Sequence, residues 1–550
     1  MPERTTPSWQ FVSGAARRAL LNVIAFSDTD IFPAPLEAGF LAADPEKVMS
    51  AIRMLHEEFD QYILEHPPTP IRALSPVSQV GYRLASQIDP LWNIYYLTLV
   101  ICAGGHIEGA RSPRGVGSVF SYRFLENAEG NRVFDPSIAW TAFTQKTEEK
   151  CQDAGFVIIC DIADFYHRIS WSRLSEALTK IGPPAWIVAR LGQILDKMDI
   201  GCFGLPVGGP ASRLLAEMML VDFDNALDDR EIPYCRYVDD IRVFSETEEQ
   251  AYETLGVVSD VLWKSGLSLQ KAKTRVVQTE ILLEEIGRPH LAGVIPTKSD
   301  QKARSDAQIL VSLAQADPYS ELRVQRDLEL EAFAKGPDAV AIIEREFLKP
   351  RPNVHLAKRL VSSIAHLPWK DLNSACSFLL SRVAPHHLAP FLARLMSTIA
   401  DRLDEMPDDI RSNIYRLLQE TLIEDRIRTN APLNSASFLR LISRFPDANN
   451  PILDEKLHAW FAAADHPLVT CELLLLWVRW RRDKELARAF GERSTPWTPA
   501  DRRALFCIYV HDPAMRTSLL NAGYSPDDLH HGGASLPDAP YLSLPVSWPI

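Results

Sequence analysis

Three acidic side chains in the first half of the sequence lie where short β-forming runs end. Asp161 follows the apolar run FVIIC, and Asp239 and Asp240 separate the runs YCRYV and IRVF. A two-residue hairpin turn is usually Asn-Gly or Asp-Gly, because its central residues need positive φ. Two neighbouring carboxylates also repel each other, by about 4 kcal/mol at about 4 Å and an effective dielectric near 20. Residues so unfavourable for a turn indicate a functional site.

The chemistry of these side chains selects a class of ligand. With Asp161 beside the 239–240 turn, the three carboxylates form an all-oxygen set, which favours Mg²⁺ or Mn²⁺. Two such ions about 3.5–4 Å apart would activate an attacking hydroxyl and stabilise the leaving group in phosphoryl transfer. Cys160 and Cys235 do not change this expectation. Cys160 points to the opposite face of its strand from Asp161, and we expect both cysteines in the core.

A Gly/Pro-rich segment lies between the two acidic motifs. Residues 204–209 read Gly-Leu-Pro-Val-Gly-Gly and form a loop that can approach a base pair closely. Pro210 is expected to begin a helix, because proline is favoured at the first helical position. The apolar residues that follow repeat every four positions and predict one buried stripe: Leu215, Met219, Phe223 and Leu227.

In this order, the segments resemble palm motifs A, B, C and D of reverse transcriptases. The motifs are Asp-x-x-x-Phe-Tyr, then Gly-Leu-Pro-x-Gly with a Ser and a helix, then Tyr-Val-Asp-Asp, and finally GLSLQKAKT. The resemblance covers about residues 75–300 and implies the fingers and palm of a right-hand polymerase. It implies that Asp161, Asp239 and Asp240 are catalytic and, together with Ile162, bind two magnesium ions.

The resemblance also implies roles in nucleotide binding. Tyr166 matches the steric gate that excludes a ribose 2′-OH, and Gly208 lies in the nucleotide-binding loop. Lys273 matches the motif D lysine, a candidate general acid for pyrophosphate departure. The segment RSPRGVGSVFSYRF resembles part of the fingers, where Arg123 would contact the triphosphate. The alternative for Arg123 and Lys273 is a solvated surface charge.

One residue departs from the common pattern. Many reverse transcriptases carry Gln where this chain has Val207, and a valine cannot hydrogen-bond to the incoming nucleotide. The strings Gly-Leu-Pro-Val-Gly, Ser-Arg-Leu-Leu-Ala-Glu and Phe-Ser-Tyr-Arg-Phe resemble the abortive-infection and unknown-group reverse transcriptases of bacterial phage defence. Those proteins also attach a helical-repeat domain behind the palm.

The chain changes character near residue 300. Before it, β-type runs alternate with helical segments, which is typical of an α+β domain. After it, segments of helical period are separated by short polar links, as in an α-solenoid of HEAT-like repeats; examples are residues 354–367, 386–400, 410–427 and 435–445. We therefore predict three parts: a helical extension of the fingers over 1–74, a reverse transcriptase fingers-palm domain over 75–300, and an all-α helical-repeat domain over 301–550.

The charge distribution argues against a protein that coats nucleic acid by charge alone. Residues 1–300 contain 28 Lys+Arg and 40 Asp+Glu, a balance of −12, and residues 301–550 contain 30 and 31, a balance of −1. A protein of that kind should be basic. One local exception is a group that could stack on single-stranded nucleic acid, the alternative being a solvated helix face: Arg479, Arg481 and Arg482, beside Trp477 and Trp480.

The function expected from the resemblance is DNA synthesis from dNTPs in antiphage defence. The acidic balance favours protein-primed, untemplated synthesis, with Tyr415, Tyr509 and Tyr524 among the candidate priming hydroxyls. The expected partners are self-made DNA, a possible non-coding RNA and further copies of the chain in a homo-oligomer. The alternatives are RNA-templated synthesis on a partner non-coding RNA, an idle polymerase-shell scaffold, and an RNA polymerase, against which Tyr166 argues.

The composition favours a bacterial cytoplasmic location. No apolar run approaches the roughly 20 residues that span a bilayer, and the first residues, MPERTTPSWQ, show no secretory signal. The eight cysteines are scattered, without metal-binding spacing. A disulfide framework or a structural zinc site is therefore not expected.

Overall fold

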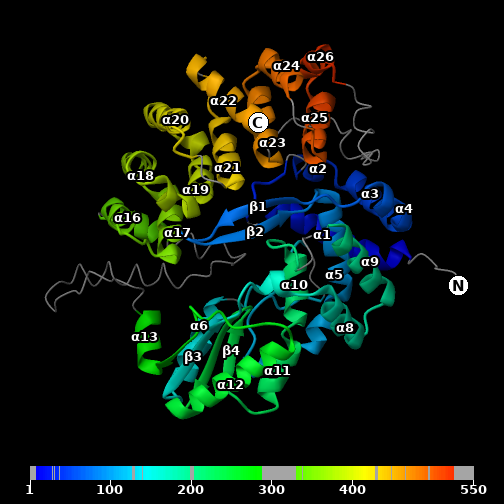
Figure 1. The fold of residues 1–550 in the computed structure, drawn as a ribbon, viewed down its shortest axis with the longest axis vertical. Coiled ribbons are helices and arrows are strands. Elements are labelled where there is room, and N and C mark those ends of the chain that lie inside the picture. Colours follow the sequence, from blue (N-terminus) through cyan, green and yellow to red (C-terminus); the bar gives the residue numbers. More distant parts are fainter. Residues whose placement is uncertain are drawn as a thin grey trace. The chain divides into compact units, whose positions relative to one another are not determined.

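A computed structural model describes most of the 550-residue chain. The described residues are 8–27, 29, 31–35, 38–126, 130–138, 140–198, 204–287, 330–336, 338–427, 431–447, 449–464, 466–493 and 496–524. The chain divides into two compact units (Figure 1). Unit 1 comprises residues 1–29 and 92–329, and unit 2 comprises residues 30–91 and 330–550.

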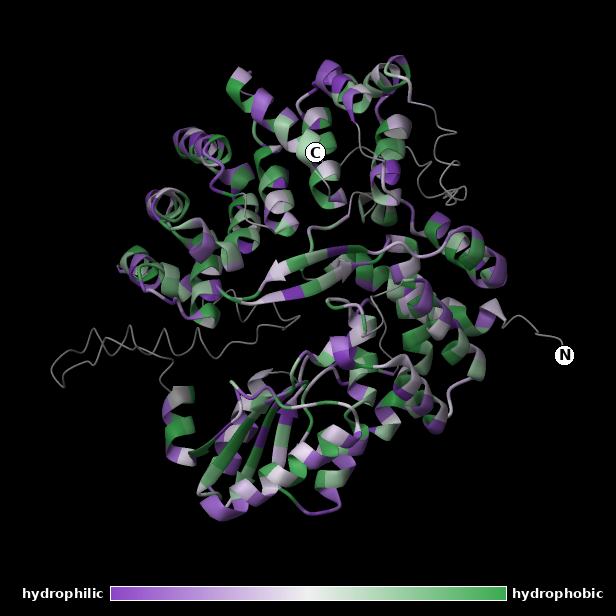
Figure 2. Cartoon of the chain, in the orientation of Figure 1, coloured by the Kyte–Doolittle hydropathy of each residue, from purple (hydrophilic) through white to green (hydrophobic). Residues whose placement is uncertain are grey.

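A four-stranded antiparallel sheet with the order β4-β5-β3-β6 forms the centre of unit 1. Its strands are β3 (Phe156–Asp161), β4 (Tyr234–Tyr237), β5 (Asp240–Ser245) and β6 (Arg275–Gln278). These are the four β-type runs expected from the sequence. The strands are coloured mainly as hydrophobic in Figure 2, and residues 157–160 of β3 are all buried. A continuous apolar strand of this kind is covered on both faces.

Unit 1 also contains helices, some of which pack on this sheet. They are α1 (Trp9–Phe26), α5 (Pro90–Ala110), α6 (Trp140–Cys151), α7 (Phe165–Arg168), α8 (Trp171–Ile181), α9 (Ala185–Lys197), α10 (Pro210–Met218), α11 (Val221–Asp228), α12 (Glu248–Lys264) and α13 (Thr279–Gly287), with a 3₁₀ turn at Arg114–Val116. Helix α12 packs on β3 and β5 and begins with a capping box between Thr247 and Gln250. Helix α5 is apolar nearly all round, as expected of a buried helix.

Unit 2 contains two layers of stacked helices. They are α16 (Ala339–Phe347), α17 (Val354–Ser363), α18 (Trp369–Ser381), α19 (Pro385–Ala400), α20 (Asp408–Ile423), α21 (Pro432–Ile442), α22 (Pro451–Ala463), α23 (Pro467–Arg479), α24 (Asp483–Glu492), α25 (Pro499–His511) and α26 (Pro513–Asn521). From α16 onward, each helix packs against the helix two positions later in the chain, so even- and odd-numbered helices form separate layers. The expected largely helical second half is thereby confirmed.

An N-terminal segment completes unit 2. It contains α2 (Ala38–Ala43), α3 (Pro45–Glu57), α4 (Phe59–Glu65) and the antiparallel hairpin of β1 (Ile71–Pro76) and β2 (Tyr82–Gln87). Apolar residues of this segment share one buried cluster with the C-terminal helices: Phe32, Ala73, Ala85, Leu433, Ala436 and Leu468. The predicted boundary between residues 74 and 75 therefore falls inside β1. Residues 30–91 group with residues 330–550 in one compact unit.

The other predicted boundary, at residue 300, lies outside the described residues. Within the described ranges, no helix is both long and apolar enough to cross a membrane.

Candidate active site

The sheet register places Asp161 directly opposite Asp240. Strand β3 ends at Asp161 and β5 begins at Asp240, and the two residues are antiparallel cross-strand partners. Side chains at such positions project on the same face with Cβ atoms about 4.5–5.5 Å apart. Asp239 precedes Asp240 in the connection from β4. The structure therefore brings the first motif beside the second, as the sequence predicts.

The turn between β4 and β5 lies one residue earlier than predicted. Tyr237 pairs with Asp240, so the two connecting residues are Val238 and Asp239, and Asp240 already belongs to the strand. Val238 has a φ of 55°. Positive φ is unusual for a β-branched residue, because its branched Cβ crowds the backbone. The strain at this turn therefore lies on Val238 and not on a pair of aspartates.

A lysine faces the two opposed carboxylates. The Lys273 Nζ atom lies 2.6 Å from Asp161 Oδ2, with the lysine side chain 64% exposed and the aspartate side chain 14% exposed. Burial raises the pKa of Asp240, and the charge of Asp161 adds to this, while Arg242 and Lys273 act in the opposite direction. Lys273 is therefore an ion-pair partner at the candidate site rather than only a solvated charge.

Carboxylate oxygens are suitable ligands for a hard divalent cation, but the described side chains are not arranged as a preformed metal site. Among the described residues, no group of three or more His, Cys, Asp or Glu side chains is arranged to hold a metal ion. Ile162 is buried and bridges to Leu269. The pKa of Asp240 is raised, mainly because its carboxyl group is buried. Metal ligation by Asp161, Ile162, Asp239 and Asp240 stays a prediction.

Tyr166 lies on α7, close behind Asp161, and supports the glycine-rich loop. Its carbonyl accepts a hydrogen bond from Leu205 N at 2.9 Å, and Gly204 N donates to Ile169 O at 3.2 Å. The phenol is half-buried, and burial raises its pKa well above the usual value. Further contributions come from Tyr122, Asp239 and Glu217, with Arg213 opposing them. The Tyr166 ring therefore lies within electrostatic reach of the β4–β5 turn.

Glycines shape this loop where side chains would not fit. Gly204 has a φ of 100°, and a Cβ there would lie 2.6 Å from His167 Cα and 2.7 Å from the Tyr166 carbonyl oxygen. Gly208 is buried with a φ of 127°. Val207 is only 5% exposed. The backbone of the loop is thus held against the segment that follows Asp161.

The predicted single helix after Pro210 is two helices. Helix α10 ends at Met218 and α11 begins at Val221, with Met219 N and Leu220 N bonded three residues back, to Ala216 O and Glu217 O. Such i−3 bonds tighten the backbone and end the α-helical ladder. The four residues of the predicted apolar stripe are all buried, so their assignment to the core is confirmed.

Arg123 is not the solvated surface charge that one of the two sequence interpretations describes. It is 2% exposed, and its guanidinium donates to Glu108 Oε1 at 2.8 Å and to the Ser112 carbonyl at 2.9 Å. Because Glu108 neutralises Arg123 inside the unit, the residue is not a solvated charge. The predicted contact of Arg123 with a triphosphate stays a prediction, and it would require the guanidinium to give up part of this buried pairing.

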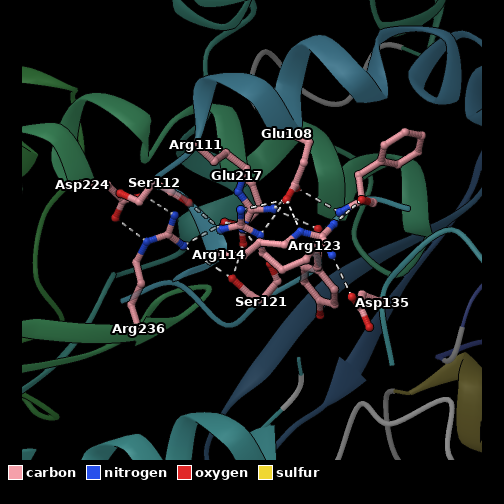
Figure 3. A network of polar contacts seen from close by, with 12 residues as sticks. Glu108, Arg111, Ser112, Arg114, Ser121, Arg123, Asp135, Glu217, Asp224 and Arg236 are labelled. Atoms are coloured by element: carbon pink, nitrogen blue, oxygen red, sulfur yellow. Dashed lines mark hydrogen bonds and ion pairs between the residues drawn. The ribbon is translucent and has the colours of Figure 1, made fainter. Parts of the chain in front are cut away.

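Arg123 belongs to a larger network of ion pairs and hydrogen bonds that the sequence did not predict (Figure 3). Its members are Glu108, Arg111, Ser112, Arg114, Ser121, Arg123, Asp135, Glu217, Asp224 and Arg236. Arg236 stands inside the run YCRYV and Glu217 inside LLAEMML. A charged residue within an otherwise apolar element is rarely buried unless it is paired. The positions of these two residues in apolar runs could therefore have indicated buried ion pairs. Burial opposes ionisation of Glu217, but Arg111 and Arg236 outweigh it and lower its pKa.

The predicted nucleic-acid patch in unit 2 is not supported. Trp477 and Trp480 are 1% and 7% exposed, and Trp480 Nε1 donates to Phe445 O at 2.9 Å, so neither ring is available for stacking. The three arginines bind groups within the chain: Arg479 binds Ser443, Arg481 binds Asp512 and Arg482 binds Asp447.

The comparison with protein-family models identifies a match within unit 1. Residues 118–288 match the family model described as reverse transcriptase (RNA-dependent DNA polymerase). No curated protein matches the chain. Among solved structures, a telomerase from Candida albicans in complex with a fragment of telomeric RNA is similar at 9% identity and a TM-score of 0.29. That alignment covers 74% of this chain and 64% of the telomerase chain, so this chain spans less than two thirds of that relative.

The matched range contains all four strands of the sheet and both acidic motifs. Residues 118–288 of this chain therefore form a reverse transcriptase domain, an RNA-dependent DNA polymerase domain.

Proposed function

We propose that this protein is a DNA polymerase of the reverse transcriptase type that adds dNTPs by two-metal phosphoryl transfer. The observation that carries the proposal is the cross-strand pairing of Asp161 with Asp240 next to Asp239, inside the matched domain. In the reaction, a primer hydroxyl attacks the α-phosphorus of the dNTP. A new P–O bond forms, and the bond to the pyrophosphate leaving group breaks.

The proposed roles of the side chains rest on the resemblance of the motifs and agree with the positions of the residues. Asp161, Asp239, Asp240 and the carbonyl of Ile162 would hold Mg²⁺, which supplies charge stabilisation for the attacking and leaving oxygens. Lys273 forms an ion pair with Asp161. To donate a proton from its ammonium group to pyrophosphate, Lys273 would have to move away from that carboxylate.

Tyr166 and Gly208 are the proposed contacts to the nucleotide. The ring of Tyr166 would exclude a ribose 2′-OH. The backbone at Gly208 would approach the nucleotide or base pair, and Val207 beside it adds no hydrogen bond.

We further propose protein-primed, untemplated synthesis in antiphage defence. The support is the balance of −12 over residues 1–300, where charge alone does not attract a long duplex. Of the candidate priming hydroxyls, those of Tyr415 and Tyr524 are buried, which makes Tyr509 the preferred candidate of the three. The defence role rests on the resemblance of the motifs to phage-defence enzymes.

The test uses the purified full chain with Mg²⁺ and labelled dNTPs, with and without added RNA. Label should stay with the polypeptide under denaturing conditions and be released by protease. D239N should abolish incorporation, because it removes a carboxylate charge from the candidate site. D222N is the matched control, since Asp222 is an exposed acid on α11 of the same unit. Free products that appear only with added RNA would overturn protein priming in favour of RNA-templated synthesis. Wild-type activity in D239N would overturn the polymerase site.

A further inference from the structure

Two buried guanidinium groups in unit 1 share one carboxylate oxygen. Arg111 Nη2 and Arg236 Nη1 lie 2.7 and 2.8 Å from Glu217 Oε2, and all three side chains are 0% exposed (Figure 3). Ser121 Oγ donates to the other oxygen, Oε1, at 2.5 Å. Glu217 therefore joins helix α10 to the end of α5 and to strand β4.

Each of the two arginines also reaches the carbonyl of a strained residue. Arg111 Nη1 donates to Tyr122 O at 2.9 Å, and Tyr122 has a φ of 43°. Arg236 Nη1 makes a longer contact of 3.5 Å with Val238 O, and Val238 has a φ of 55°. Non-glycine residues keep such conformations only where the surroundings hold them. The network therefore holds the backbone at Tyr122 and at Val238 in these strained conformations, and Val238 directly precedes Asp239.

Strand β4 is fixed at Arg236 by its backbone as well as its side chain. Arg236 N donates to Ser118 O at 2.8 Å, and Arg236 O accepts from Phe120 N at 3.0 Å. The guanidinium also donates two hydrogen bonds to Asp224 on α11, from Nε and Nη2, at 2.7 and 2.6 Å. The next residue, Tyr237, is the cross-strand partner of Asp240. The chain thus enters the turn from a point anchored to α10, α11 and residues 118–120.

We propose that Arg236, through its pairing with Glu217 and Asp224, is a positioning residue for Asp239 and Asp240. Its guanidinium contacts neither carboxylate in the contacts described above; it holds the strand and the strained Val238 from which both acids follow. The inference rests on the proposed function for the chemistry that Asp239 and Asp240 perform. The positioning itself is a property of the fold and can be measured separately.

The test is R236K in the full chain. Lysine keeps the buried positive charge but lacks the planar fork that grips Asp224 while reaching Glu217 and Val238. Amide hydrogen exchange at residues 238–240 should become about tenfold faster, while exchange in β3 stays unchanged. The kcat for dNTP incorporation should fall by about 10- to 100-fold, with the KM for dNTP within about twofold. R230K is the control, since Arg230 is exposed and, among the described contacts, its side chain bonds only to Ala226 O.

A second variant separates positioning from general stability. Glycine adopts positive φ without steric cost, so adding V238G to R236K should return exchange at 238–240, and part of kcat, towards wild type. Unchanged exchange at the turn in R236K, or an equal increase throughout unit 1, would overturn the inference, as would a lack of rescue by V238G. If the wild-type chain incorporates no dNTP, the proposed function fails, and the exchange measurement still decides the role of Arg236.

Discussion

At the scale of single residues, the candidate site combines opposed negative charges with one lysine. Asp161 and Asp240 face each other across β3 and β5, and Lys273 neutralises Asp161 at 2.6 Å. An ammonium group carries one positive charge, whereas the proposed metals carry two each. Burial raises the pKa of Asp240, and the charge of Asp161 adds to this, while Arg242 and Lys273 act in the opposite direction. Carboxylate oxygens facing each other in this way are ligands that hard divalent cations prefer.

Tyr166 gives a prediction at this scale. Tyr166→Ala should reduce the preference for dNTPs over NTPs by about tenfold or more, equivalent to at least about 1.4 kcal/mol of lost discrimination. The reason is that the half-buried ring would no longer collide with a ribose 2′-OH. The measurement is kcat/KM for both nucleotide classes. Tyr166→Phe keeps the ring and should keep the preference; equal use of NTPs and dNTPs by the unmodified protein would contradict the gate assignment.

The acidic residues could be predicted from the sequence because the signal is local. Asp161 ends a strand, Asp240 begins one and Asp239 directly precedes it, and the order of the motifs indicated which strands would meet. Arg123 could not be placed in this way. Its burial depends on Glu108, which approaches only when the end of α5 packs beside the 111–124 segment. The turn was predicted one residue too late because Val238 is apolar and β-branched, so that it continues the β-type run YCRYV in the sequence.

At the scale of elements, the glycine-rich loop is held against the segment that carries Tyr166. Gly204→Ala should destabilise unit 1 by about 3 kcal/mol, because a Cβ there meets His167 Cα and Tyr166 O at 2.6 and 2.7 Å and also strains a positive φ. Denaturant unfolding of the full chain measures this change.

Gly182→Ala is the matched control for this substitution. Gly182 ends α8 with a φ of 81°, but a Cβ there meets no atom within 4 Å. Gly182→Ala should therefore lower the free energy of unfolding by only about 1 kcal/mol, the cost of placing a side chain at positive φ. An equal loss of stability in the two variants would contradict the close packing of the loop on the Tyr166 segment.

Strands and helices differ in how far the sequence determines them. The runs at β3 to β6 and the helices of unit 2 were predictable, since each shows a clear apolar period bounded by breakers. The hairpin of β1 and β2 was missed. Its residues, IRALSPVSQVGYRLASQ, do not alternate strictly, and part of its core comes from Leu433, Ala436 and Leu468. Those partners are more than 300 residues away in sequence, so no local pattern could reveal them.

At the scale of the whole molecule, each unit is assembled from two separate stretches of chain. Residues 30–91 interrupt the sequence of unit 1 and fold with residues 330–550. Polar contacts reinforce this grouping: Arg440 Nη1 donates to Ala34 O at 2.6 Å, Arg503 Nη1 donates to Thr69 Oγ1 at 3.0 Å, and His466 Nε2 bonds to Arg72 O at 2.6 Å. The N-terminal segment therefore depends on residues at the other end of the chain.

This arrangement predicts the result of truncation. A chain that ends after residue 329 leaves Phe32, Ala73 and Ala85 without their partners in α21 and α23. An isolated two-stranded hairpin is only marginally stable in water, so residues 71–87 should lose amide protection and become the first site of limited proteolysis. Peptides from β3 and β5, whose pairing lies wholly within unit 1, should keep their protection and serve as the internal control. Retained protection of the hairpin in the truncated chain would show that residues 30–91 fold without the C-terminal helices, as the predicted fingers extension requires.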